Sequence, residues 1–246
     1  MTVSALALTT LFLQAPAPDE AASLVPADAA ILVRVESLAG MAELVNAFAE
    51  VGQDEPVVPA RILGDLPYPG PAENVDPTRP VYLAISFAPD QPAPGMTWIV
   101  PARSGTPLGL DNSDGAFTLH VAGDYTSITS RPGVARPSAP SLLVAALRPG
   151  LVAVHLDLAT LIERFRPLID MGLRQAETGL DSLPTDPSVP FDPSEMFEWY
   201  FGFARECLAS AEALDLALGR AGETLTLRGR YRVKAGSLQE FARVET

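Results

Sequence analysis

The sequence predicts an α+β fold in which two related β-α-α-β-β units share a mainly antiparallel sheet, with helices packed on one face. A strand pattern and a helix pattern near residue 31 recur together near residue 151. In both segments two helix patterns precede two strand patterns, and turn residues separate the strands. A match that spans both periodicities is harder to obtain by chance than either alone, so we expect an internal duplication.

The two copies differ by one residue at the junction between strand and helix. The stretch V-R-V-E-S-L-A at 33–39 corresponds to V-H-L-D-L-A at 154–159. After the junction the matches keep one constant offset: Leu38 with Leu158, Ala39 with Ala159, Met41 with Leu161, Glu43 with Glu163, Val45 with Phe165, Phe48 with Leu168, Glu50 with Asp170 and Gly52 with Gly172. The shared apolar positions indicate that both helices pack on a core.

These patterns divide the chain into three parts. We expect residues 1–23 to be a signal-like segment and a mobile linker, and residues 24–150 to be the first unit with an extra hairpin. Residues 151–246 are expected to form the second unit, in which no counterpart of that hairpin follows, so the sequence leaves open whether this unit is truncated. If it is, one edge of the sheet is left open for a missing segment or a partner.

Each element of the first unit has its own sequence signal. Strands are expected at 30–36, 81–87 and 96–102, helices at 38–51 and 56–66, and a hairpin at 116–121 and 125–130 closed by a turn at 122–124. Ser37 is a plausible N-cap for the first helix. The proline-rich stretch between the second helix and the next strand predicts a loop.

The second unit follows a short helix expected at 141–147. A strand is expected at 151–156, and Asp157 takes the capping position of Ser37. The next helix carries a continuous apolar face and Pro167, which is expected to kink it. A helix at 194–211 and strands at 213–219 and 223–234 complete the unit.

The N-terminal sequence favours export. Residues 3–13 form an uncharged apolar run of signal-peptide length, followed by small residues and prolines. No basic residue precedes the run and a proline follows the candidate cleavage site, so the sequence leaves cleavage open. We expect a periplasmic, cell-envelope or secreted bacterial protein with no transmembrane helix in the mature chain.

Composition excludes several functions. The formal net charge of −13 repels phosphate backbones, so we expect no nucleic-acid partner. The single cysteine, Cys207, excludes an intrachain disulfide and a cysteine-rich zinc site. Motifs for serine hydrolases, zinc proteases, phosphate loops and dinucleotide binding are all missing. We therefore predict no catalytic, cofactor or metal residues, and a non-catalytic role is favoured over an enzyme.

Isolated polar residues are better explained as structure. His120 and His155 lie on strands of different units, and we expect each to face solvent or a polar neighbour. The run at 111–115 lacks the spacing and the terminal glutamate of an EF-hand, which favours a turn. Glu43 and Glu163 occupy matched positions on the polar faces of two helices.

Two patterns indicate a candidate surface for a ligand or partner. Arg228, Arg230 and Arg232 alternate along the last strand, which is explained either by a solvated sheet face or by a site for an anionic ligand or acidic partner. Aromatic residues crowd the helix that starts near residue 194 and cannot all face one core stripe. Phe165, Trp199 and Phe203 are therefore candidates for lining a cavity or meeting a partner.

The opening L-V-P-A-D-A-A-I-L-V-R-V, residues 24–35, together with the duplicated element order, resembles an uncharacterised family of exported bacterial proteins. The resemblance covers most of the chain after residue 23. It implies the fold and export only, because no catalytic residues can be carried over from such a family.

Three functions fit these observations. The leading hypothesis is a binding or scaffold protein of the cell envelope whose partner is an unknown protein. The first alternative is a carrier of a lipid or other hydrophobic ligand, which predicts an apolar cavity lined partly by Phe165, Trp199 and Phe203. The second is a hydrolase with dispersed carboxylates, which predicts acidic residues that converge in a cleft with perturbed pKa values.

Overall fold

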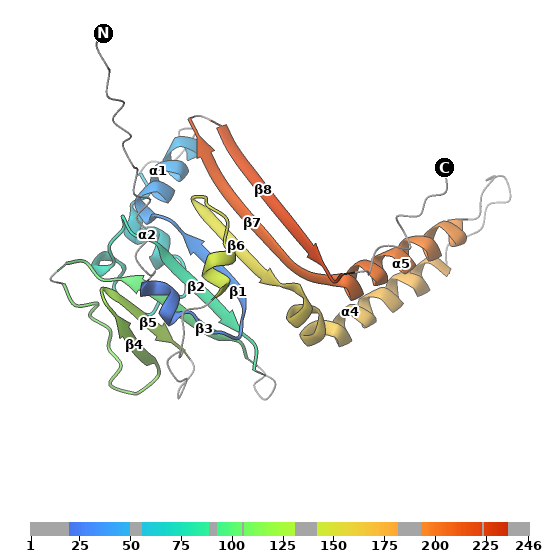
Figure 1. Ribbon diagram of the computed structural model, residues 1–246, viewed down its shortest axis with the longest axis horizontal. Coiled ribbons are helices and arrows are strands. Elements are labelled where there is room, and N and C mark those ends of the chain that lie inside the picture. The colour runs from blue at the N-terminus through green and yellow to red at the C-terminus, as the bar shows by residue number, and fades with distance from the viewer. Residues whose placement is uncertain are drawn as a thin grey trace, which may run out of the picture.

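A computed structural model describes residues 20–49, 56–88, 93–104, 106–130, 142–181, 193–222 and 224–235. The described part contains one antiparallel sheet together with helices, which confirms the α+β class (Figure 1). The signal-like run at 3–13 lies outside the described residues. Among the helices that are described, none has the length and apolar content needed to cross a bilayer.

The first unit has the predicted order of elements. Its elements are η1 (Glu20–Leu24), β1 (Ala29–Val35), α1 (Leu38–Ala49), α2 (Pro59–Gly64), η2 (Ala72–Asn74), β2 (Val81–Ser86), β3 (Gly95–Pro101), β4 (Thr118–Ala122) and β5 (Tyr125–Thr129). Ser37 caps α1, because its Oγ accepts a hydrogen bond of 3.0 Å from the amide of Gly40. Gly123 supplies the positive φ, 55°, that closes the β4–β5 hairpin.

The second unit repeats this order. Its elements, preceded by α3 (Leu142–Ala146), are β6 (Val152–Asp157), α4 (Leu158–Asp181), α5 (Pro193–Ser210), β7 (Ala211–Ala221) and β8 (Thr224–Val233). Asp157 caps α4, since its Oδ1 accepts a hydrogen bond of 3.0 Å from the amide of Thr160. The same capping chemistry therefore starts both long helices, as predicted. That the units arose by duplication stays a prediction.

The eight strands of the described residues form one sheet in the order β4-β5-β3-β2-β1-β6-β7-β8, and every neighbouring pair is antiparallel. The two units meet at β1 and β6, where Val33 pairs with Val154, the residue that matches it in the sequence. From this junction, β2 and β3 follow β1 on one side while β7 and β8 follow β6 on the other. The first unit adds the β4–β5 hairpin beyond β3, whereas β8 is the last strand on its side among the residues that the structure describes.

Helices and apolar side chains cover both faces of the first unit's part of the sheet. On one face Leu38 of α1 and Leu63 of α2 pack with Trp98 and Val100 of β3. On the other face η1 and α3 cover Tyr82 and Ile99. In the first unit, α1 and α2 thus pack on one face of the sheet as predicted. The short helices η1 and α3 form a second layer on the opposite face. The fold also begins earlier than predicted, because Ala21 in the expected mobile linker is fully buried.

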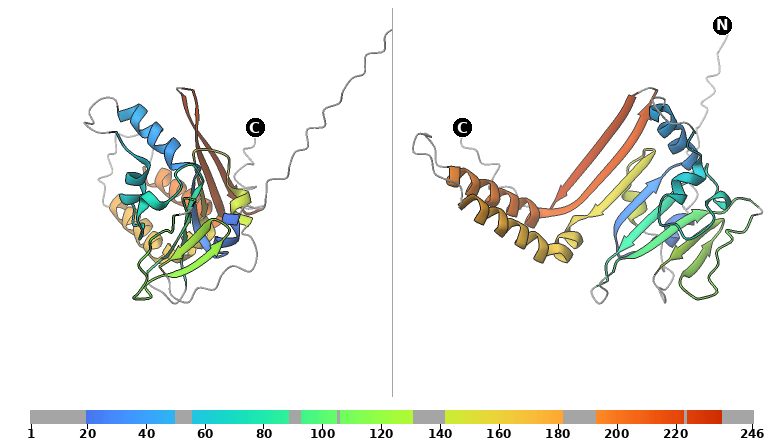
Figure 2. Two further views of the ribbon diagram at one scale, coloured as in Figure 1. Left: turned by 90° about the vertical axis from the view of Figure 1, so that its left-hand side faces the viewer. Right: turned by 180° about the vertical axis from the view of Figure 1, so that it is seen from behind.

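The long helices of the second unit do not fold back over the sheet. Instead α4 and α5 form a hairpin that extends away from the end of the sheet (Figures 1 and 2). No residue separates β6 from α4, and none separates α5 from β7. The strand β6 therefore leads directly into α4, and α5 leads directly into β7. In the first unit residues 65–80 separate α2 from β2 and give the chain the length to return across the sheet.

Candidate functional site

The matched registers of the two units allow their residues to be compared row by row across the sheet. One row of the first unit runs outward through Arg34, Tyr82 and Ile99, which pair in turn across β1, β2 and β3. The corresponding row of the second unit contains His155 on β6, Asp215 on β7 and Arg230 on β8. Beyond the two central strands, Tyr82 and the apolar Ile99 of the first unit therefore correspond to the charged Asp215 and Arg230 of the second.

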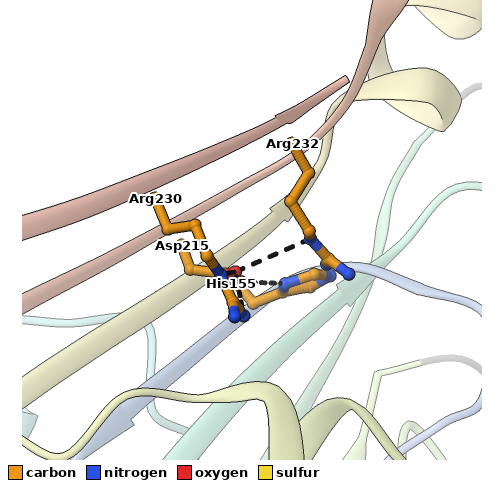
Figure 3. A network of polar contacts seen from close by, with 4 residues as sticks. All are labelled: His155, Asp215, Arg230 and Arg232. Atoms are coloured by element: carbon orange, nitrogen blue, oxygen red, sulfur yellow. Dashed lines mark hydrogen bonds and ion pairs between the residues drawn. The ribbon is translucent and has the colours of Figure 1, made fainter. Parts of the chain in front are cut away.

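These three residues and Arg232 form a polar network on one face of the sheet (Figure 3). His155 Nδ1 lies 2.7 Å from Oδ1 of Asp215. Arg230 donates two hydrogen bonds to Oδ2 of Asp215, at 3.0 Å from Nε and 2.8 Å from Nη2. Arg232 Nε lies 3.7 Å from the same oxygen, a distance that fits an ion pair but is too long for a hydrogen bond.

Burial makes Asp215 the centre of this network. The residue is 0% exposed and His155 is 3% exposed, whereas the side chains of Arg230 and Arg232 are 46% and 38% exposed. Burial by itself raises the pKa of Asp215, but hydrogen bonds from His155 and Arg230 and the charge of Arg232 outweigh it. The pKa of Asp215 is therefore lowered, and the carboxylate stays ionised beneath two half-exposed guanidinium groups.

The network ties β8 to the sheet, because Arg230 on β8 and His155 on β6 both bond to Asp215 on β7 between them. A histidine oriented by a carboxylate is half of a general-base arrangement, which also needs a nucleophile or a positioned water. In the described part of the chain, the side chain of His155 hydrogen-bonds only to Asp215. Nor do the described residues gather three His, Cys, Asp or Glu side chains in a group that could hold a metal ion.

The other face of β8 joins an aromatic surface on α5. Trp199 stacks on Phe203 with ring centroids 5.6 Å apart, and the ring of Tyr200 meets the edge of Trp199 at 5.1 Å. One turn beyond Phe203, the carbonyl of Cys207 accepts a hydrogen bond of 3.0 Å from the hydroxyl of Tyr231 on β8. We call these aromatic side chains, together with the exposed leucines on the same face of β8, the β8–α5 surface; it consists of Trp199, Tyr200, Phe203, Leu225, Leu227 and Tyr231.

This region belongs to a wider concentration of exposed apolar side chains. Among the described residues, nine of the thirteen large apolar side chains that are exposed lie on α4, α5 and β8: Phe165, Leu168, Met171, Trp199, Tyr200, Phe203, Leu225, Leu227 and Tyr231. In the first unit the position that corresponds to Tyr231 is held by Val100, which is 0% exposed against 47% for Tyr231. The second unit thus leaves uncovered a face that the first unit buries.

A groove of about 340 Å³ lies at the base of the α4–α5 hairpin. Ile162, Ile169, Leu173 and Leu208 line its apolar floor, and charged side chains including Arg166 and Arg205 line its rim. Phe165, Trp199 and Phe203 are not among the residues that line it. The groove therefore differs from the cavity that the carrier hypothesis predicts.

The structure brings together some of the sequence-predicted site residues and separates others. Arg230 and Arg232 share Asp215, whereas Arg228 is exposed farther along β8. Trp199 and Phe203 contact each other, while Phe165 packs against Phe87 with centroids 5.7 Å apart. These contacts do not test whether the residues bind a ligand or partner.

Sequence reasoning missed Asp215, although a signal for it exists. Asp215 is a lone charge in the stretch A-L-D-L-A, in the phase of the strand taken by Ala213 and Ala217. A buried acidic residue that shares a strand face with alanines requires a cation or a hydrogen-bond donor on a neighbouring strand. His155 was expected to face solvent or a polar neighbour, and the structure places it against the second. Comparison of the chain with known protein families, curated proteins and solved structures finds no match.

Proposed function

We propose that this protein is a non-catalytic binding or scaffold module of the cell envelope that docks a protein partner on the β8–α5 surface. The observation that carries the proposal is the gathering of exposed apolar side chains beside β8, a strand with no neighbour on its outer side within the described residues. A concentration of exposed large apolar side chains on a few neighbouring elements is typical of interaction sites. The envelope location is supported by the sequence of the N-terminal segment.

A protein partner suits this surface better than a lipid does. The outer edge of β8 presents backbone N–H and C=O groups, and hydrocarbon cannot satisfy them. Aromatic rings with a polar rim, here Trp199, Tyr200 and Tyr231 beside the arginines of β8, have the composition of a protein interface. The surface therefore combines apolar contact with backbone hydrogen bonding.

Photo-crosslinking in cells of the source organism tests this proposal. A benzophenone amino acid replaces Leu227 or Trp199 in the full chain, and Val121 serves as the control because it is exposed on β4, the edge strand of the first unit. We expect a discrete protein adduct from positions 227 and 199 and none from position 121. Equal adducts from all three positions, or none from 227 and 199, would contradict the proposal.

A second candidate, a carrier of a small hydrophobic ligand, is favoured by the groove between α4 and α5. Its floor of Ile162, Ile169, Leu173 and Leu208 is apolar, and its volume of about 340 Å³ falls in the range of small-molecule pockets. Native mass spectrometry of the purified full chain tests it. A bound ligand that is lost on substitution Leu173→Arg would support a carrier, and an unliganded mass would contradict it.

A further inference from the structure

The first unit shows what can pair with a strand in the position of β8. A partner strand on β8 would be one form of the docking proposed above. In the first unit the strand at the corresponding place, β3, is not an edge, because β5 pairs with it antiparallel. Five residue pairs join them, from Thr97 with Thr129 to Pro101 with Tyr125. The fold therefore already accommodates an extended strand at this distance from the β1–β6 junction.

The registers locate the corresponding position on β8. Val33 pairs with Leu83, and Leu83 pairs with Trp98. In the second unit Val154 pairs with Leu216, and Leu216 pairs with Gly229. Trp98 thus corresponds to Gly229, and the stretch that β5 covers, Thr97–Pro101, corresponds to Arg228–Arg232.

The side chains of β8 define the chemistry of one face of an added strand. Arg228, Arg230 and Arg232 all point to the face of the sheet that holds the polar network, because alternate residues of a strand share a face. Asp215 anchors Arg230 and Arg232 there and offsets one of the three positive charges. Directly opposite residues of antiparallel strands share a face, so acidic side chains of an added strand would lie beside these arginines.

The opposite face of β8 is apolar, and Leu216 of β7 leans over Gly229, because a Cβ at position 229 would lie 3.3 Å from Leu216 Cδ2. Leu227 and Tyr231 flank Gly229, which has no side chain where the first unit places Trp98. An apolar residue of the added strand opposite Gly229 would pack beside Leu216, Leu227 and Tyr231. The added strand therefore has apolar residues on this face, which also holds Tyr231, the residue that hydrogen-bonds to α5.

We propose that the outer edge of β8 pairs antiparallel with an extended partner segment in which acidic residues alternate with apolar ones, in register with Arg228–Arg232. A second copy of this chain is a poorer occupant, because β8 paired with itself would place arginines opposite arginines. The overall charge of −13 does not prevent binding. Charges farther away than about 8 Å are largely screened at physiological salt, so the nearby arginines dominate.

Peptide binding to the full chain tests the proposal. The probe is a fluorescein-labelled peptide of about nine residues, the length of a typical strand, in which Glu alternates with Val and Ile. One control peptide has Lys in place of every Glu, and another carries N-methyl groups on alternate residues, which remove the amide donors of one strand edge. Fluorescence anisotropy measures affinity for the wild-type chain, Arg228→Glu and Arg61→Glu, the last being an equal charge change at an exposed position of α2.

We expect the Glu peptide to bind, and both control peptides to bind at least about tenfold more weakly. Arg228→Glu should weaken the Glu peptide about tenfold, because one attractive cross-strand pair becomes repulsive, while Arg61→Glu should leave its affinity unchanged. Equal binding of the Glu and Lys peptides, or full binding of the N-methylated peptide, would overturn the proposal.

Two further results separate this inference from the proposed function. Adducts at position 227 in cells without any binding of the Glu peptide would show that docking occurs but that the partner has another chemistry. A dimer in light scattering whose β8 amides are protected from hydrogen exchange would identify a second copy as the occupant. Absence of both adducts and peptide binding would contradict the two proposals together.

Discussion

The two units of this chain share an order of elements and a strand register, yet one is closed and the other open. In the first unit both faces of the sheet are covered, and Val100 is 0% exposed. In the second unit the residue at the corresponding place, Tyr231, is 47% exposed, and the long helices extend away from the sheet. The same topology can therefore build a core or present a surface.

Two local features explain the difference. The first is chain length at the junctions, since β6 and β7 join their helices without a connecting residue, whereas residues 65–80 allow α2 to lie on the sheet. The second is polarity, since Tyr82 and Ile99 are replaced in the corresponding row by Asp215 and Arg230. On the face opposite Tyr231, the charged hydrogen bonds to Asp215 thus take the place of the apolar contacts that Tyr82 and Ile99 make in the first unit.

The largest expected effect is on core stability in the closed unit. Ile99→Ala removes a fully buried side chain and should lower the free energy of unfolding by about 2–5 kcal/mol. Leu227→Ala in the open unit should change it by less than about 0.5 kcal/mol, because that side chain is 72% exposed. Urea denaturation of both variants measures the two free energies of unfolding. Similar losses of stability in the two variants would contradict the difference between a closed and an open unit.

The next effect concerns the ionic row. Asp215→Ala leaves the buried Nδ1 of His155 without its partner and should lower the free energy of unfolding by about 1–3 kcal/mol at neutral pH. Asp65→Ala is the control, since that carboxylate is exposed and lies 3.9 Å from Arg61. It should have little effect in the same denaturation experiment.

The stabilising effect of Asp215 should also depend on pH. Because the folded state lowers the pKa of Asp215 below its ordinary value of 3.8, its contribution is complete above that value. The contribution is lost as the pH falls through the folded pKa. Denaturation at a series of pH values should therefore show the difference between wild type and Asp215→Ala shrinking below pH 3.8, and a difference that stays constant would refute this role.

A smaller effect should be equal in the two units. Ser37→Ala and Asp157→Ala each remove the acceptor that caps a long helix, and each should cost about 1 kcal/mol. Thermal denaturation compares them. If only one substitution destabilises the chain, the two helix starts are not equivalent despite their matching geometry.

The smallest effect on stability accompanies the clearest spectroscopic contrast. The chain has two tryptophans, Trp98 at 4% exposure in the closed unit and Trp199 at 57% in the open unit. Acrylamide should quench the fluorescence of Trp98→Phe, which retains Trp199, far more than that of Trp199→Phe. Trp199→Phe should leave the free energy of unfolding within about 0.5 kcal/mol of wild type. Equal quenching in the two variants would show that α5 is covered.

Local sequence patterns predicted most of the elements, because strand periodicity, capping residues and turn glycines act over a few residues. Ser37, Asp157 and Gly123 all have the roles expected of them. The sequence also showed that arginines alternate along β8 and therefore share one face of that strand. Asp215 escaped prediction because its partners depend on strand register, which joins His155 to Asp215 and Asp215 to Arg230 across three strands.

The direction of the helices was equally hidden from the sequence. The apolar face of α4 predicted packing on a core, but the absence of connecting residues at 157–158 and 210–211 appears only when the element bounds are known. The burial of Ala21 had no periodic signal, because η1 is a single short turn on the sheet. Function is still less predictable, since exposure of Trp199 and Leu227 is a property of the assembled fold.

Residue-resolved hydrogen exchange of the full chain tests most directly the claim that β8 is an unoccupied pairing edge. Alone, the chain should show strong protection along β3, which has neighbours on both sides, and rapid exchange at the outward amides of β8. Addition of the Glu peptide should protect β8 and leave β3 unchanged. Protection of β8 equal to that of β3 in the isolated monomer would contradict the account.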